Sequence, residues 1–206
     1  MHIVGYIHVC QTGEWRRVLD MIFTELRQSG LYDVTSVINC CVVTDTVPDT
    51  SFANDKCKIL VKGRTALYER PTLLHLRDTA DDGTLYWYVH TKGLRWFGTP
   101  SEQNVMHWVR YMMYFDFTRW QDAVASLTSG YDTYGTDFSL GPKPHYSGNF
   151  WWARGSYIKK LPTSIGSGYF DPEFWIGTAS PKAMVAHTCS VNPYHDAYPP
   201  ERYRVY

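Results

Sequence analysis

Neither sign of charge is in excess in this sequence. Its 20 lysine and arginine residues are matched by 20 aspartate and glutamate residues, so it lacks the broad basic surface that attracts nucleic acid or an anionic membrane. No apolar run is long enough to span a bilayer, and no amino-terminal secretion signal is recognisable. We therefore expect neither a nucleic-acid partner nor a membrane span.

Cysteine is also sparse, with five residues, an odd number, and no Cys-x-x-Cys pair. A disulfide framework or a cysteine-based zinc site is therefore not indicated. A reduced, cytoplasmic compartment fits this pattern best. Cys40 and Cys41 lie in an apolar run, which predicts small buried side chains rather than redox chemistry.

Several catalytic motifs are missing. The sequence has no Gly-x-Gly-x-x-Gly after its first strand-like run, no Gly-x-x-x-x-Gly-Lys-[Ser/Thr] and no His-Glu-x-x-His. These absences argue against a dinucleotide-dependent oxidoreductase, a P-loop phosphotransferase and a zinc hydrolase. Gly166-Ser167-Gly168 is too short for the nucleophile elbow of a serine hydrolase.

Strand and helix patterns alternate in the first part of the chain. Apolar residues recur every three or four positions from residue 14 to 28, which predicts a helix joining two parallel strands. The pattern is typical of an α/β nucleotide-binding half, and the length indicates one domain. The predicted order is strand 2–10, helix 14–28, strand 34–44, strand 58–62, helix 68–77 and strand 85–90, followed by helices 105–115, 120–127 and 154–161 and a strand at 131–138.

The aromatic strand that begins at Leu85 ends in four residues with useful chemistry: His90, Thr91, Lys92 and Gly93. In open α/β sheets, ligands bind beyond the carboxyl ends of the strands, so this stretch is a candidate binding site. The alternative is a strand that runs into a solvated turn.

Two later stretches, 145–153 and 172–177, combine aromatic rings with isolated polar groups. Tryptophan and tyrosine faces pack well on sugar rings, while His145, Asn149 and Glu173 offer hydrogen bonds to hydroxyls. Glu173 lies between apolar neighbours and could accept a proton from an attacking hydroxyl. Its alternative role is to stabilise the first turn of the helix that begins near residue 174.

Taken together, residues 69–73, 87–93, 145–153 and 172–177 resemble small glycosyltransferases of GT-A type. Such enzymes occur in bacterial surface-glycan loci and in large DNA viruses, among them chlorella viruses that build capsid glycans. The resemblance implies one GT-A-like α/β domain over residues 1–206, with a central mixed, mostly parallel sheet flanked by helices. Residues 1–93 would form the nucleotide-binding half and residues 94–206 the sugar and acceptor half.

The resemblance also implies a reaction. A sugar would pass from a UDP-sugar to a hydroxyl of an oligosaccharide or glycoprotein acceptor with a divalent metal, manganese, as cofactor, in the host cytoplasm if the protein is viral. Glu173 would be the catalytic base of an inverting transfer. The donor would be held by Glu69, Thr72, His90, Thr91, Lys92 and Gly93, and the sugar and acceptor by His145, Gly148, Asn149, Trp151 and Trp152.

One position departs from the wider superfamily. Where an Asp-x-Asp metal motif would end the central strand, the sequence has His90-Thr91-Lys92. Either His90 binds a metal with a nearby carboxylate such as Asp78, or Lys92 replaces the metal as counter-charge of the diphosphate. Asp81-Asp82-Gly83 is a further carboxylate source, although Asp-Gly favours a turn before the strand.

A non-catalytic carbohydrate-binding module is the alternative function, because abundant aromatic residues suit sugar binding as well. Such modules seldom contain a strand–helix–strand nucleotide-binding half. The predicted architecture of residues 1–93 therefore favours the enzyme.

Overall fold

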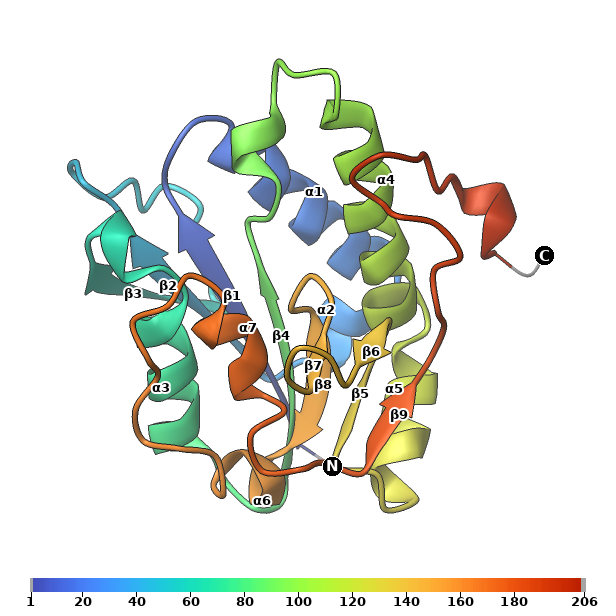
Figure 1. Ribbon diagram of the computed structural model, residues 1–206. Coiled ribbons are helices and arrows are strands. Elements are labelled where there is room, and N and C mark those ends of the chain that lie inside the picture. The colour runs from blue at the N-terminus through green and yellow to red at the C-terminus, as the bar shows by residue number, and fades with distance from the viewer. Residues whose placement is uncertain (1, 205–206) are drawn as a thin grey trace.

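The computed structural model describes residues 2–204, which build one α/β domain around a seven-stranded sheet (Figure 1). The strand order is β3-β2-β1-β4-β8-β5-β9. The strands are β1 (His2–Cys10), β2 (Val37–Val43), β3 (Cys57–Gly63), β4 (Thr84–His90), β5 (Thr133–Gly135), β8 (Trp151–Arg154) and β9 (Ala183–Val185), with β6 (Phe138–Ser139) and β7 (His145–Tyr146) forming a separate pair.

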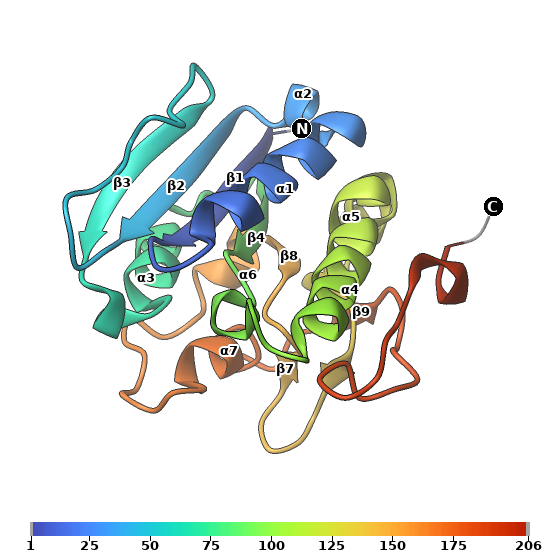
Figure 2. The ribbon, with the colours of Figure 1, turned by 90° about the horizontal axis from the view of Figure 1, so that it is seen from above.

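Helices cover both faces of the sheet (Figure 2). On one face, α1 presents its apolar side to a core that also contains α4 and α5. On the other face, α3, α6 and α7 pack on a second core. The helices are α1 (Trp15–Gln28), α2 (Leu31–Val34), α3 (Arg70–Thr79), α4 (Glu102–Met113), α5 (Trp120–Thr128), α6 (Gly155–Ile158) and α7 (Asp171–Trp175), with a π-helical turn at Tyr114–Thr118 after α4.

The predicted fold class is confirmed. Strand β1 pairs in parallel with both β2 and β4, and β2 pairs in parallel with β3, as the strand–helix–strand pattern requires. The sheet becomes mixed at β8, which runs antiparallel to β4 and β5. No helix within residues 2–204 is long and apolar enough to cross a membrane.

The second half of the chain differs from its predicted elements. The predicted strand at 131–138 is split into β5 and β6, and the predicted helix at 154–161 shortens to α6. Strands β8 and β9 were not predicted. These strands are three or four residues long, so they depend on neighbouring strands more than on a pattern of their own.

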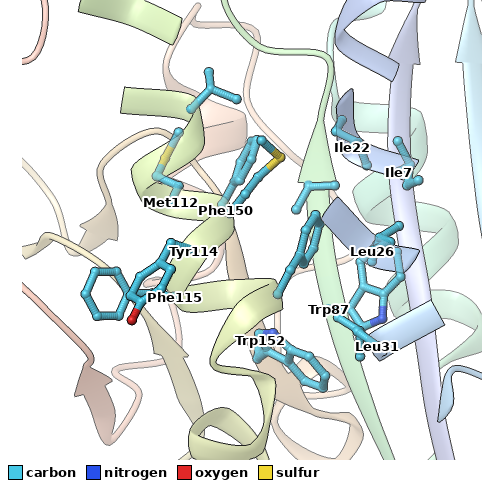
Figure 3. Packing of buried hydrophobic residues seen from close by; sticks show 14 of the residues in the cluster. Ile7, Ile22, Leu26, Leu31, Trp87, Met112, Tyr114, Phe115, Phe150 and Trp152 are labelled. Carbon is cyan, nitrogen blue, oxygen red and sulfur yellow. The ribbon is translucent and has the colours of Figure 1, made fainter. Parts of the chain in front are cut away.

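The core is dominated by large rings that approach the backbone closely. Trp87 lies against β1 at Gly5, where an added Cβ atom would come within 2.0 Å of the indole. The indole nitrogen of Trp87 donates to the Thr35 hydroxyl at 3.1 Å. Figure 3 shows Trp87 beside Leu26 and Leu31, with Trp152 in the same core nearer to α4. Glycine at position 5 is therefore a packing requirement.

Asp116 is an unusual member of this core. It is 1% exposed, and neither carboxyl oxygen has a hydrogen-bond partner within the described chain. Burial raises the pKa of the Asp116 carboxyl well above its usual range. The folded protein therefore holds this group as the neutral acid, at a position inside the π-helical turn.

We predict that Asp116→Asn stabilises the protein increasingly as pH rises from 4 to 7. The unfolded carboxyl ionises near pH 4, while the folded one stays protonated, so the native protein binds the extra proton and loses stability as pH rises. The neutral amide removes this loss. Urea denaturation of variant and wild type at several pH values measures the difference. A pH-independent difference would contradict the prediction.

Candidate functional site

A cavity lies beyond the carboxyl ends of β1 and β4, where the strand order of the sheet reverses. Neighbouring strands β1 and β4 end side by side, with His8 paired to His90 in register. From β1 the chain continues to β2 and β3 on one side of this pair, and after β4 it continues to β5, β8 and β9 on the other side. Ligands bind at such a switch point in open α/β sheets. The cavity has a volume of about 610 Å³ and is lined by His8, Cys10, Thr12, Gly13, Thr65, Ala66, Tyr68, Glu69, residues 90–96, Val105, Trp108, Tyr169 and Tyr194.

The predicted stretch from His90 to Gly93 lines this cavity. Thr91 is buried, and its hydroxyl accepts a hydrogen bond from the Cys10 amide at 3.0 Å, which ties the ends of β1 and β4 together. Gly93 has a φ of +87°, and a Cβ there would lie 2.9 Å from atoms of Val105 and Met106. The turn after β4 thus requires glycine.

Lys92 is the cation that this turn places in the cavity. Its ammonium lies 4.2 Å from the centre of the Trp108 ring. No carboxylate in the described chain is within ion-pair distance of it, whereas the charges of Glu173 and Glu69 act on it from further away. Burial lowers the pKa of Lys92, and the two glutamates partly oppose this shift. An anion that enters the cavity would therefore stabilise the charged form of the Lys92 amine.

Glu69 anchors one wall of the cavity from the residue just before α3. One of its carboxylate oxygens accepts hydrogen bonds from the Tyr88 hydroxyl and the Asn149 amide. Asn149 in turn accepts a bond from the Trp151 indole at 2.8 Å and has a φ of +58°. Burial, followed by the charge of Glu69, raises the pKa of Tyr88 well above its usual value.

Two histidines lie beside this carboxylate as neutral rings. His90 Nε2 donates to the Gly148 carbonyl at 3.0 Å, and its other nitrogen lies 3.9 Å from Glu69. Burial, helped by the charge of Lys92, lowers the pKa of His90 to about 3, and burial lowers that of His8 to about 4. His8 is hydrogen-bonded to the fully buried Thr72 at 2.8 Å.

Glu173 reaches the same region from α7. Its Oε1 accepts the Gly148 amide at 2.7 Å, while the Gly148 carbonyl accepts the His90 ring, so one glycine links α7 to the end of β4. Glu173 also lies in the first turn of α7, as its alternative role expects, although no side-chain hydrogen bond caps this helix. Gly148 has a φ of +91°, and a Cβ there would meet Met112 Sδ at 2.5 Å.

Several residues predicted to hold the donor, the sugar or the acceptor are buried or lie outside the cavity. Trp151 and Trp152 are fully buried and belong to the cores on opposite faces of the sheet, because they occupy successive positions of β8. Thr72 and Asn149 are buried and act through His8 and Glu69. His145 lies outside the cavity, where it donates to the Lys143 carbonyl.

The predicted pairing of His90 with Asp78 in a metal site is wrong. Asp78 lies near the carboxyl end of α3 and is 67% exposed beside Arg77, whereas His90 neighbours the residue before that helix. Asp81 accepts the Gly83 amide, as expected of the turn before β4. Among residues 2–204, no three histidine, cysteine, aspartate or glutamate side chains are placed to hold a metal ion.

The sequence reasoning missed His8 and the aromatic rim of the cavity. His8 lies near the end of β1 and pairs in register with His90 at the end of β4. A histidine near the end of each strand was therefore the sequence signal that could have predicted this pair. The rim consists of rings from four separate segments, for which no local pattern exists: Tyr68, Trp96, Tyr169 and Tyr194.

A family match covers this region. Residues 34–165 match a family described as a domain of unknown function, DUF8361. The chain belongs to this family. No curated protein matches the sequence.

Two solved structures resemble the fold of this DUF8361 protein. Rv0371c from Mycobacterium tuberculosis H37Rv aligns with a TM-score of 0.53 at 9% identity, over 93% of this chain and 90% of that one. HddC from Yersinia pseudotuberculosis aligns with a TM-score of 0.49 at 10% identity, over 91% of each chain. At such low identity the likeness to Rv0371c shows a shared fold and nothing about activity.

We predict a strong coupling between Glu69 and Tyr88. Glu69→Ala leaves the buried Tyr88 hydroxyl unpaired, which costs about 1–3 kcal/mol of unfolding free energy. In the Tyr88→Phe background the same substitution should cost less, because no hydroxyl remains to be satisfied. A double-mutant cycle by chemical denaturation measures the coupling. A coupling energy near zero would show that the bond contributes nothing to stability.

Proposed function

We propose that this DUF8361 protein is a glycosyltransferase that moves a sugar from a UDP-linked donor to a hydroxyl of a glycan acceptor, in surface or capsid glycan synthesis. The observation that carries the proposal is Lys92. It is a partly buried cation without an ion-pair partner in the described chain, within a cavity at the switch point of the sheet. A nucleotide diphosphate is an anion that suits this position.

The cavity offers a place for each part of such a donor. Lys92 would neutralise the diphosphate, and the aromatic rim, which includes Tyr68 and Tyr169, would stack on the base or sugar ring. The neutral rings of His8 and His90 would add hydrogen-bonding groups without adding charge. The volume of about 610 Å³ lies within the usual range of small-molecule sites.

Glu173 is our candidate for the base. One oxygen is held by the Gly148 amide, and the second accepts no hydrogen bond from residues 2–204. In an inverting transfer, the acceptor oxygen forms a bond to the anomeric carbon as the bond from that carbon to the diphosphate oxygen breaks. The acceptor proton passes to Glu173, and the bonding electron pair leaves with UDP, beside Lys92.

Manganese has no evident protein site here. No three histidine, cysteine, aspartate or glutamate side chains among residues 2–204 are placed to hold an ion, and Glu69 is the one carboxylate in the described lining of this cavity, beside imidazoles that suit manganese less well than oxygen does. We therefore assign no step to a metal and give the counter-charge to Lys92.

We predict that UDP raises the unfolding temperature of the wild-type protein more than GDP or CMP does, with or without manganese. Lys92→Met should weaken UDP binding by roughly 10-fold or more, because a hydrogen bond to a charged group contributes about 1.5–3 kcal/mol. Lys182→Met is the control, since Lys182 also lies over a ring, that of Tyr131 at 4.5 Å. No shift with any nucleotide would refute the transferase and favour the carbohydrate-binding module.

We predict that Glu173→Gln lowers sugar transfer by about 100-fold or more while leaving UDP stabilisation intact. Glutamine keeps an oxygen that can accept the Gly148 amide, so the link between α7 and the end of β4 is preserved. Donor screening with a product-linkage assay supplies the substrates for the rate measurement, and Glu102→Gln, at the ion pair with Arg17, is the control. Unchanged turnover would remove Glu173 from the mechanism.

A further inference from the structure

A second cavity of about 540 Å³ lies at the opposite end of the strands, on the face of the sheet that carries α3. Its walls come from the first residues of β1, β2, β3 and β4 and from the carboxyl-terminal half of α3. It shares no lining residue with the cavity at the switch point.

Asn39 is the first sign that this cavity binds something. It stands in the middle of β2, is 9% exposed and lines the cavity. Its side-chain amide makes no hydrogen bond with any residue from 2 to 204 and is open to the cavity, since it is not among the sealed polar atoms of the core. A strand interior also disfavours asparagine. An unpaired amide at this position is explained by a partner that enters the cavity.

Lys58 supplies a second unpaired donor next to the first. It is the residue of β3 paired with Asn39, so both side chains extend from the same face of the sheet into the cavity. Lys58 is exposed at the rim of the cavity, and its ammonium has no ion-pair partner in the described part of the chain. Two N–H donors, one of them charged, therefore lie side by side.

Several other polar groups around this cavity are engaged within the protein. The Tyr6 hydroxyl is hydrogen-bonded to His75 at 3.0 Å and to Thr79 at 2.8 Å. Asp81 accepts bonds from the Gly83 amide and the Thr84 hydroxyl. His2 and His75 each use one ring nitrogen, in the bonds to Thr84 and Tyr6. Asn39 and Lys58 are neighbouring donors without a partner among residues 2–204, and an acceptor with one negative charge suits this pair.

We propose that this cavity binds a small monocarboxylate. One carboxylate oxygen accepts from the Asn39 amide and the other from the Lys58 ammonium. The ring or alkyl part of the ligand packs on the apolar wall formed by Val4, Val37 and Leu60. Both a sugar acid and a free organic acid have this chemistry. The proposal does not depend on the function proposed above, because it uses none of the same residues.

The test is an NMR titration of the ¹⁵N-labelled full chain, with the side-chain amide of Asn39 as reporter. Benzoate and glucuronate represent the two sources of a carboxylate, and benzamide and glucose are their uncharged counterparts. We expect at least one acid to shift the Asn39 amide and to bind at least 10-fold more tightly than its counterpart. Equal binding of acid and counterpart, or no shift with either acid, would overturn the proposal.

Two substitutions separate binding from structure. Asn39→Val, followed by the backbone amides of the cavity lining because the reporter itself is lost, should abolish acid binding and raise the unfolding temperature, because valine favours strands. Lys58→Met should weaken acid binding at least 10-fold, whereas the exposed control Lys160→Met should not. Wild-type affinity in Lys58→Met would refute the site. Both variants should respond to UDP as the wild type does, so failure here leaves the transferase proposal intact.

Discussion

The parallel pairing of β1 with β4 is the constraint on which the rest of the site depends. It brings together two strand ends that are about 80 residues apart in the chain, at the point where the strand order of the sheet reverses. The cavity lies beyond these ends, lined by the turns that follow β1 and β4, by Glu69 and by the first half of α4. Thr91 reinforces the pairing through the Cys10 amide, so the floor of the cavity is part of the sheet itself.

The sequence predicted the parallel part of the fold well, because each element there has its own local signal. Helix α1 has a clear apolar stripe, and β1, β2 and β4 are long and β-branched or aromatic. The site was predicted only in part. His90 and Lys92 follow a strand end and could be found, whereas the bond between Asn149 and Glu69 joins residues 80 positions apart and left no local pattern. Tryptophans 151 and 152 look like ligand-binding residues in sequence, but alternation along β8 buries both.

Few polar side chains among the described residues lack both a partner and access to water. The effect of a missing partner depends on whether the group is sealed in the core or lines a cavity. Asp116 is sealed within the core, where neutrality is its only way to avoid the cost of a buried charge. Lys92 and Asn39 instead line cavities, so a ligand can supply the missing partner. The missing partner thus lowers the stability of the protein permanently at Asp116, whereas at Lys92 and Asn39 a ligand that supplies the partner gains binding free energy.

The position of β8 between β4 and β5 has a consequence for synthesis on the ribosome. The strands β1 to β4 can pair as soon as residue 90 has emerged, but the outer edge of β4 has no partner until residues 151–154 follow. During that interval an aromatic strand presents free backbone groups, which is a template for association with other chains. The long helix α4 emerges before β8 and packs on one face of the incomplete sheet. It covers the apolar surface of that face during the interval in which the edge of β4 is unpaired.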